Sequence, residues 1–218
     1  FGSDAQRERW LPGLCDGSLV SSFAMSEPGA GSDTGAIATT ATLLDDGSYR
    51  LDGEKAWVTL GPVCDVVIVF ATTQPGSGWW GLTAFLVDAG AEGVVFGEVE
   101  PKMGMRSCPF GRLRLDGCIV GADQILGGVG AGGSLFSAAV EAERAFLYAA
   151  QLGSMERVLD RTIQRARSRE QFGQPIGGFQ AIAHRVVEMK LRHESSRLLL
   201  YAAAAKYDLV PVELPEYT

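Results

Sequence analysis

The sequence predicts an α+β protein in which an antiparallel β domain, a sandwich or barrel, is followed by long helices of an incomplete C-terminal helical bundle. Two observations carry this prediction. Between about residues 21 and 126, short apolar or alternating runs are separated by turn signals, as in strands. From about residue 134, apolar residues recur at spacings of four and seven, as in amphipathic helices. No helix-length segment lies between the strands, which excludes parallel βαβ units.

Length and composition agree with a globular chain. Its 218 residues are 46% hydrophobic, enough for one sizeable core or two small ones in series. The net charge of -7 and the absence of a Lys or Arg run argue against nucleic-acid binding. No window reaches the roughly 18 apolar residues of a membrane span, and the first residues lack a signal-peptide pattern. Phe1 in place of Met suggests that the start of the protein is missing.

Cysteine and histidine spacing predicts neither a disulfide scaffold nor a metal site. The four cysteines are Cys15, Cys64, Cys108 and Cys118. They show no CxxC spacing, so we expect reduced thiols in a cytoplasmic protein. His184 and His193 are nine residues apart without an array of Cys or carboxylates, so we expect no metal and place both on the helix surface.

The first elements are a short helix and a series of strands. Residues 1–20 are predicted to be the end of a helical region, with a helix over residues 4–14 that stops at Pro12 and Gly13. A β domain over residues 21–126 follows. Its strands are expected at residues 39–44, 49–51, 55–59, 63–72, 82–87, 94–99 and 111–120. Asp46-Gly47 is a strong hairpin signal between the first two.

Five glycines within residues 127–133 mark the expected domain boundary, so residues 127–218 are predicted to form a partial C-terminal helical domain. A first long helix is expected from an N-cap at Ser134 to about Arg169, and a second over residues 179–207. The tail from Pro211, with two prolines, is expected to end the ordered chain. Two long helices cannot bury both faces alone, so other helices must complete this half.

The stretch FAMSEPGAGSD, residues 23–33, is the candidate binding loop. Its glycines and its fixed proline suit a loop that exposes backbone N–H groups to a flat or anionic ligand. An ordinary turn explains a glycine-rich loop equally well.

Trp57 and Thr59 lie two residues apart on an expected strand, so their side chains share one face and Val58 takes the other. An aromatic plane and a hydroxyl are thereby presented together. The alternative is that Trp57 is a core residue, as strand tryptophans usually are.

Glu143 falls on the apolar face of the first long helix. The residues that share this face are Phe136, Val140, Leu147 and Ala150. Desolvation there would raise the pKa of the carboxyl group toward the range of a general base. An interhelical ion pair with Arg144 or with an arginine elsewhere is the alternative. Arg169, in the last turn of the helix, is explained by the helix dipole alone.

Three stretches, in this order, resemble the acyl-CoA dehydrogenase family: FAMSEPGAGSD, Trp57-Val58-Thr59, and SREQFGQPIGGFQ at residues 168–180. The resemblance covers residues 1–208 and implies FAD as cofactor. The loop residues that it assigns to the flavin are Phe23, Met25, Ser26, Gly31 and Ser32. Ser26 would lie at the pyrimidine side of the ring and Ser32 near the pyrophosphate. Trp57 would pack behind the ring and Thr59 would bond near N5.

The same resemblance implies an oligomer. Arg169, Phe172 and Gln180 would reach the FAD of a neighbouring subunit, with the Arg169 guanidinium on the pyrophosphate. A homo-oligomer, either a dimer or a tetramer, or a heteromer is therefore expected.

The implied reaction is the α,β-dehydrogenation of an acyl thioester, on CoA or a carrier protein, to the trans-enoyl thioester. A base removes the α proton while the β hydrogen leaves as hydride to flavin N5, and an electron acceptor flavoprotein takes the electrons. Glu143 resembles the position from which a minority of the family supplies that base, the majority using a later Glu beyond this chain. Arg144 would face the pantetheine or CoA, and residues 175–204 resemble members acting on carrier-protein thioesters.

Two alternatives stay open for the function. One is a flavin oxidase or monooxygenase of the same fold. The other is a non-catalytic fragment or partner subunit of a heteromer.

Overall fold

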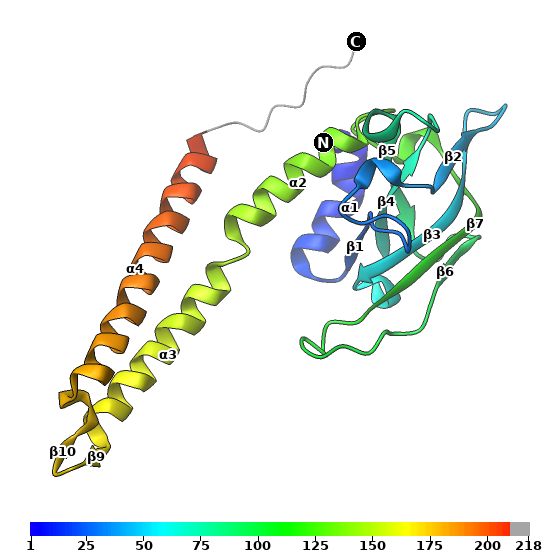
Figure 1. The fold of residues 1–218 in the computed structure, drawn as a ribbon. Coiled ribbons are helices and arrows are strands. Elements are labelled where there is room, and N and C mark those ends of the chain that lie inside the picture. The colour runs from blue at the N-terminus through cyan, green and yellow to red at the C-terminus, as the bar shows by residue number, and fades with distance from the viewer. Residues whose placement is uncertain (210–218) are drawn as a thin grey trace. The chain divides into compact units, whose positions relative to one another are not determined.

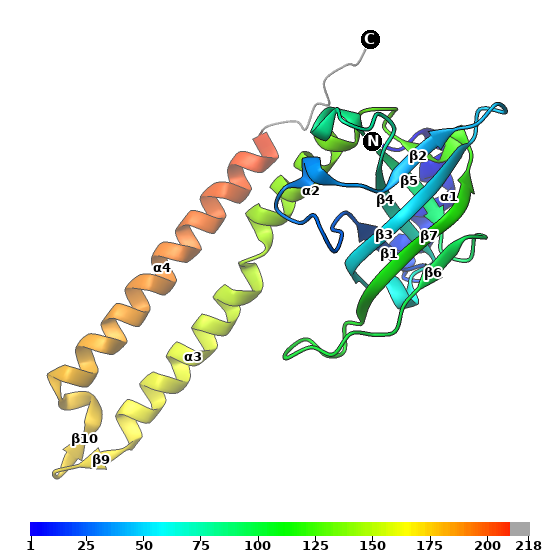
Figure 2. The same cartoon turned by 45° about the vertical axis from the view of Figure 1, so that its right-hand side comes forward.

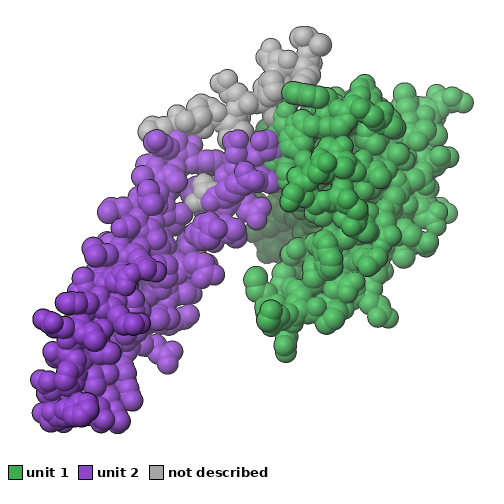
Figure 3. Space-filling model, in the orientation of Figure 1, with its two compact units in different colours: residues 1–136, 214–218 green, residues 137–213 purple. Residues whose placement is uncertain are grey.

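The computed structural model describes residues 1–209 of the chain. They form two compact units, residues 1–136 and, within the described chain, residues 137–209 (Figure 3). We call these unit 1 and unit 2. Unit 1 is built on a β-sheet and unit 2 on long helices, so the α+β class and the order of its two parts are confirmed. The tail from Pro211 that was expected to end the ordered chain lies outside the described residues.

Helix α1 (Asp4–Asp16) opens unit 1 with a capping box. The Ser3 hydroxyl accepts a bond from the Gln6 N–H, and the Gln6 side-chain oxygen accepts one from the Ser3 N–H. The predicted end of the helix at Pro12 and Gly13 is wrong. The helix continues through Pro12, which removes only one donor, and ends where Gly17 adopts the left-handed conformation.

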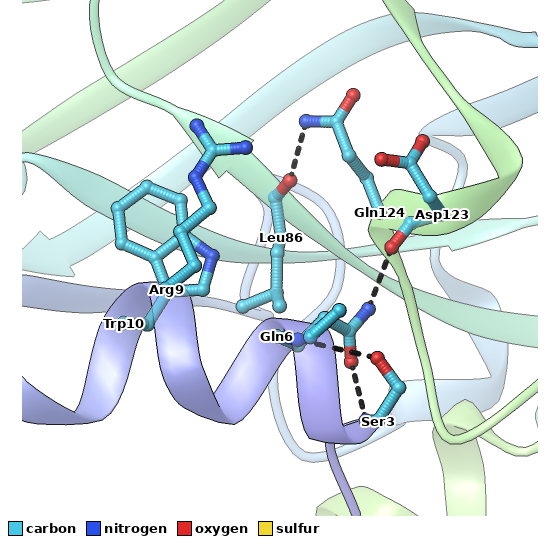
Figure 4. A pocket seen from close by; sticks show the side chains of 8 residues that line it. Ser3, Gln6, Arg9, Trp10, Leu86, Asp123 and Gln124 are labelled. Atoms are coloured by element: carbon cyan, nitrogen blue, oxygen red, sulfur yellow. Dashed lines mark hydrogen bonds between the residues drawn. The ribbon is translucent and has the colours of Figure 1, made fainter.

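The Gln6 side chain also fixes α1 to the last part of the sheet (Figure 4). Its amide nitrogen donates to the carbonyl oxygens of Asp123 and Ile125, each at 2.8 Å. Nearby, the Gln124 amide donates to the Leu86 carbonyl at 2.8 Å. Residues more than 110 positions apart in the sequence are therefore joined by one buried glutamine.

One eight-stranded sheet forms the centre of unit 1 (Figures 1 and 2). Its strands are β1 (Ser21–Ala24), β2 (Thr40–Leu43), β3 (Tyr49–Thr59), β4 (Val66–Thr72), β5 (Leu82–Asp88), β6 (Val94–Phe96), β7 (Phe110–Val120) and β8 (Ile125–Leu126). The order is β6-β7-β3-β2-β4-β5-β8, with β1 paired to β4. Most pairs are antiparallel, as predicted, but β1 runs parallel to β4 and one residue pair joins β2 to β4 in parallel. The chain passes from β1 to β4 through two other strands, with no α-helix between them.

Strand β3 is one continuous element, although the sequence predicted two short strands. Two irregularities in its pairing with β7, between Leu51 and Gly53 and between Lys55 and Val58, break the alternation on which that prediction rested. Gly53 has φ 152°, and a Cβ there would lie 2.6 Å from the Thr39 hydroxyl oxygen. Glycine is therefore required at the first irregularity.

The main core cluster of unit 1 is formed by side chains of the strands. Its fully buried members include Leu51, Val67, Val69, Phe85, Val87 and Leu113. Complete burial of such a side chain stabilises the fold by roughly 1.5–3 kcal/mol. Unit 1 thus has a hydrophobic core that is built on its own sheet.

Helix α2 (Gly132–Phe146) starts in unit 1 and begins two residues before the expected N-cap at Ser134. Two glycines form its first turn because another segment of the same chain lies too close for side chains at these positions. A Cβ on Gly132 would lie 2.8 Å from the Leu82 backbone, and one on Gly133 would lie 2.4 Å from the Trp79 ring.

Unit 2 continues with α3 (Ala149–Ser168), the short strands β9 (Glu170–Gln171) and β10 (Gln174–Pro175), and α4 (Gln180–Leu209). The single helix predicted up to Arg169 is wrong, because a turn at residues 147–148 separates α2 from α3. No Pro or Gly stands at this turn, so composition does not indicate it. The second predicted helix is confirmed as α4. No described helix is long and apolar enough to cross a membrane.

Burial in unit 2 is sparse. Among residues 137–209, the buried residues whose side chains are described are Leu152, Leu159, Ala166 and His193. The first three lie seven residues apart on α3 and form one stripe. His193 is 3% exposed and its Nδ1 has no hydrogen-bond partner, so its predicted place on the helix surface is wrong. His184 is exposed, as predicted.

Candidate functional site

The loop that follows β1 opens with a tight turn. The Glu27 N–H donates to the Ala30 carbonyl at 2.8 Å, and the Ala30 N–H donates back at 3.2 Å. Pro28 and Gly29 form the exposed tip, and residues 31–33 are exposed after it. A Cβ on Gly29 or Gly31 would meet nothing within 4 Å. The outer side of the loop is therefore open to a ligand.

Consecutive residues tie the inner side of this loop to β3. The Ala56 N–H donates to the Ser26 carbonyl at 2.8 Å. Lys55 Nζ donates to the Met25 carbonyl at 3.1 Å and to Glu27 Oε1 at 2.8 Å. The structure thus joins the loop to the strand that carries Trp57, although the two stretches are separated by a β-hairpin.

A further bond joins β1 to the end of the same strand. The buried Ser22 hydroxyl donates to the Thr59 carbonyl at 2.7 Å. Loop and strand are therefore connected on both sides of Trp57.

Glu27 and Lys55 form a buried ion pair. Lys55 is 0% exposed and Glu27 8% exposed. Burial opposes ionisation of Glu27, but the charge of Lys55 and hydrogen bonds from Lys55, Thr39 and the Ala38 N–H outweigh it and hold the pKa below its usual value. Burial lowers the pKa of Lys55 to about 8, against the opposing effect of Glu27. Both groups are therefore charged at neutral pH.

Trp57 is on the surface, so the alternative of a core tryptophan is wrong. Its side chain is 60% exposed, and its backbone has φ 60°, a left-handed conformation that is rare for a bulky residue. This conformation falls within the irregularity between Lys55 and Val58. Trp57 and Thr59 are exposed while Val58 is buried, so the two side chains share a face as predicted.

A second aromatic ring fixes the plane of Trp57. The Phe110 ring stacks on it with centroids 5.6 Å apart and an interplanar angle of 25°. Lys102 Nζ lies 4.9 Å from the Phe110 ring centroid. Part of the tryptophan is thus supported by protein, while much of its surface is left exposed.

Phe23, which lies in β1 just before the loop, belongs to an aromatic cluster. Its ring is 4.9 Å from Phe70 and 5.9 Å from Phe136, and Phe136 also meets Trp79 at 5.9 Å. Phe23 is 36% exposed, whereas Met25 is buried. The start of the loop is therefore anchored in the core.

The remaining expected cofactor residues lie at one end of the helical hairpin in unit 2. Arg169 caps α3, and its carbonyl accepts a bond from the Ile176 N–H at 2.8 Å. Phe172 is at the turn between β9 and β10 with φ 54° and is 94% exposed, touching Phe179 edge to face. Gln180 is the exposed first residue of α4. The structure brings these three residues together.

Glu143 and Arg144 lie near the end of α2, and both are exposed. The expected burial of Glu143 is wrong for this chain. Arg144 lines a groove of unit 2 together with Tyr148, Met155 and Leu199.

Sequence reasoning missed the residues that support the site. The sequence motifs do not indicate Ser22, Lys55 or Phe110, and they include Glu27 only as a part of the loop. A lysine within an apolar strand is the signal that could have pointed to the buried pair, since a buried lysine requires a partner.

Fold and site together define a class: a mostly antiparallel sheet that presents an open glycine-containing loop beside an exposed tryptophan, followed by long helices. The family model "Acyl-CoA dehydrogenase, middle domain" matches residues 22–118, and "Acyl-CoA dehydrogenase, C-terminal domain" matches residues 130–214. The chain belongs to the acyl-CoA dehydrogenase family.

Individual relatives support the same placement. The chain is 45% identical over 203 residues to L-prolyl-[peptidyl-carrier protein] dehydrogenase of Pseudomonas fluorescens, covering 93% of this chain and 53% of that protein. It is 36% identical over 206 residues to the short-chain specific acyl-CoA dehydrogenase of Megasphaera elsdenii, covering 94% and 54%.

Solved structures agree with the fold. The prolyl acyl carrier protein oxidase AnaB superposes with a TM-score of 0.89 at 44% identity, covering 94% of this chain and 54% of that one. The FAD complex of PigA superposes with a TM-score of 0.91 at 38% identity, covering 96% and 54%. The chain spans about half the length of the relatives that it matches.

Proposed function

We propose that this chain is the flavin-binding part of an FAD-dependent dehydrogenase acting on the CH–CH bond of an acyl thioester. One observation carries the proposal: Met25, Ser26 and Glu27 are bonded directly to Lys55 and Ala56, which sets the open loop beside Trp57. Family membership and the FAD-bound relative support it.

The residues of unit 1 fit a flavin. The exposed Trp57 ring offers a flat surface behind an isoalloxazine, and Thr59 offers a hydroxyl on the same face. Ser26, Gly31 and Ser32 would bind the pyrimidine edge and the pyrophosphate from the loop, where no side chain blocks approach to Gly31. Phe23 and Met25 would contribute backbone groups at the ring edge. Bound FAD supplies the hydride acceptor.

Unit 2 is proposed to serve the cofactor of a neighbouring subunit. Phe172 exposes 94% of its surface at a turn, an arrangement that suits a ring covered by another molecule. Arg169 would bind the pyrophosphate, and Phe172 and Gln180 the nucleotide half. We therefore infer a homo-oligomer, either a dimer or a tetramer, that passes electrons to an electron-transferring flavoprotein. The four cysteines are all free, which supports a cytoplasmic setting.

For the substrate, we favour a carrier-protein thioester over acyl-CoA, because the chain is 45% identical to a dehydrogenase of prolyl-carrier protein. Glu143 is the proposed base that accepts the α proton of the substrate. Arg144 is the proposed contact for the pantetheine arm. A flavin oxidase is the second candidate, favoured by the 44% identity to AnaB.

The test uses the full-length protein. The yellow protein is mixed without oxygen with prolyl-carrier protein and, separately, with butyryl-CoA, and the flavin absorbance is followed. We expect bleaching with the first and little with the second. A purified protein that holds no FAD, or that no thioester bleaches, overturns the proposal. Rapid reoxidation by air with release of peroxide would assign the oxidase instead.

A further inference from the structure

We infer that the buried Glu27–Lys55 pair is a positioning device that sets the spacing between the flavin loop and Trp57. Two segments are involved. One is the part of the candidate binding loop that follows β1, residues 25–33, and the other is the end of β3, residues 55–59. The inference rests on the proposed function and adds two residues that the flavin itself would not touch.

Both oxygens of the Glu27 carboxylate accept hydrogen bonds from the protein itself. Oε2 accepts the Ala38 N–H at 2.8 Å, and Oε1 accepts the Thr39 N–H at 2.9 Å. Oε1 also accepts the Thr39 hydroxyl and Lys55 Nζ. A carboxylate with four donors in place and 8% exposure is held in a single orientation. Glu27 is therefore a support within the loop, whereas the ligand-facing groups are on its open side.

Lys55 transmits that orientation to the strand. Its ammonium group spans from Glu27 to the Met25 carbonyl, and the next residue, Ala56, bonds to Ser26. Trp57 follows directly, in a left-handed conformation. A change at Lys55 therefore reaches both the backbone that carries Ser26 and the backbone that carries Trp57.

A purely stabilising ion pair would behave differently. Replacing a buried ion pair by apolar or neutral groups of similar size is often neutral for stability, while removing one partner leaves an uncompensated buried charge. The double variant Glu27→Gln/Lys55→Met therefore distinguishes a positioning role of the ion pair from a purely stabilising role. It removes the ion pair without leaving one uncompensated charge buried.

The experiment compares full-length apoproteins in three measurements: thermal unfolding, FAD affinity by titration, and the fluorescence of bound FAD. The variants are Lys55→Met, the double variant, and the control Glu54→Gln/Arg112→Met. The control removes an exposed ion pair of similar length, 2.9 Å, between β3 and β7. A bound flavin that stacks on Trp57 has quenched fluorescence, so this signal reports the position of the ring.

We expect Lys55→Met to unfold at a clearly lower temperature than the parent. The double variant should unfold close to the parent yet bind FAD at least about 10-fold more weakly, with brighter bound flavin. The control should match the parent in all three measurements. A double variant that unfolds like the parent, binds FAD within about 2-fold of it and has the same fluorescence would overturn the inference.

A milder variant decides the question if the double variant does not fold. Thr39→Val removes only the hydroxyl bond to Glu27 and keeps the ion pair. We expect weaker FAD binding and brighter bound flavin, and parental values of both would overturn the inference. The proposed function fails separately, in the parent protein, if that protein binds no FAD.

Discussion

The two units of this chain differ in how many of their apolar side chains they bury. Unit 1 closes a core in which residues such as Phe85 and Leu113 have no exposed surface. In unit 2, leucines on α4 such as Leu191 and Leu198 are more than 60% exposed. Unit 1 therefore has a hydrophobic core, whereas the described helices of unit 2 bury few of their apolar side chains.

The difference shows where the helical half gets its stability. Isolated helices are marginal in water, and most helical stability in proteins comes from packing of an apolar face. The stripe of Leu152, Leu159 and Ala166 provides such packing on one side of α3 only. The exposed leucines of α4 need further helices, from the rest of the protein or from another subunit.

The largest expected effect tests this comparison directly. Phe85→Ala should lower the free energy of unfolding of this chain by about 3–5 kcal/mol, because it leaves a cavity in the core of unit 1. Leu198→Ala, at 65% exposure, should change it by less than about 0.5 kcal/mol. Urea unfolding gives both values. If unit 2 lacks a core of its own, Leu198→Ala becomes destabilising only in the full-length protein. A destabilising Leu198→Ala in this chain would contradict the difference between the two units.

The next effect concerns catalysis. Glu143→Gln in the full-length protein keeps the shape of the side chain and removes the carboxylate of the proposed base, so FAD should stay bound. Anaerobic bleaching of the flavin by thioester should slow by at least about 100-fold. Glu141→Gln, two residues earlier on the helix, is the matched control. Unchanged bleaching in Glu143→Gln would place the base elsewhere.

A smaller effect is expected at the helical hairpin. Arg169→Ala should weaken FAD binding by about 10-fold, since the proposed charge-assisted bond to the pyrophosphate would be lost. Arg167→Ala is the control, because Arg167 is also exposed and lies in the last turn of the same helix. FAD titrations of the full-length protein give both affinities. Equal affinities in the two variants would confine the FAD site to unit 1.

The smallest effect is the acid response of unit 1. The pKa of Glu27 is below its usual value in the folded state, so the unfolded state takes up its proton first as the pH falls. The carboxylate therefore contributes stability above about pH 4.5, and this is lost on further acidification. Urea unfolding from pH 6 to pH 3 should show a shallower loss in Glu27→Gln/Lys55→Met than in the parent. Parallel curves would contradict this account.

Sequence reasoning worked best where a local pattern decides the structure. The hairpin at Asp46-Gly47 and helix α4 followed from turn residues and from periodicity, because both depend on neighbours in the sequence. The shared face of Trp57 and Thr59 was predicted in the same way, from the alternation of side chains along a strand.

It failed where distant contacts decide. The burial of His193 depends on tertiary packing, and the left-handed Trp57 depends on how β3 pairs with β7. The Glu27–Lys55 pair joins residues 28 positions apart, and neither residue type predicts burial. Such features become visible only when the fold is known.

The irregularity that carries Trp57 also limits how this stretch can change in length. Two residues lie between Lys55 and Val58 on β3, while one lies between their partners Leu113 and Gly111 on β7. Deleting one residue there would make the ladder regular, with Lys55 still opposite Leu113 and Val58 still opposite Gly111. Val58, now 1% exposed, would therefore stay buried. The deletion would instead remove the left-handed backbone conformation at which Trp57 is exposed. The length of this segment therefore matters for the exposed tryptophan rather than for the core.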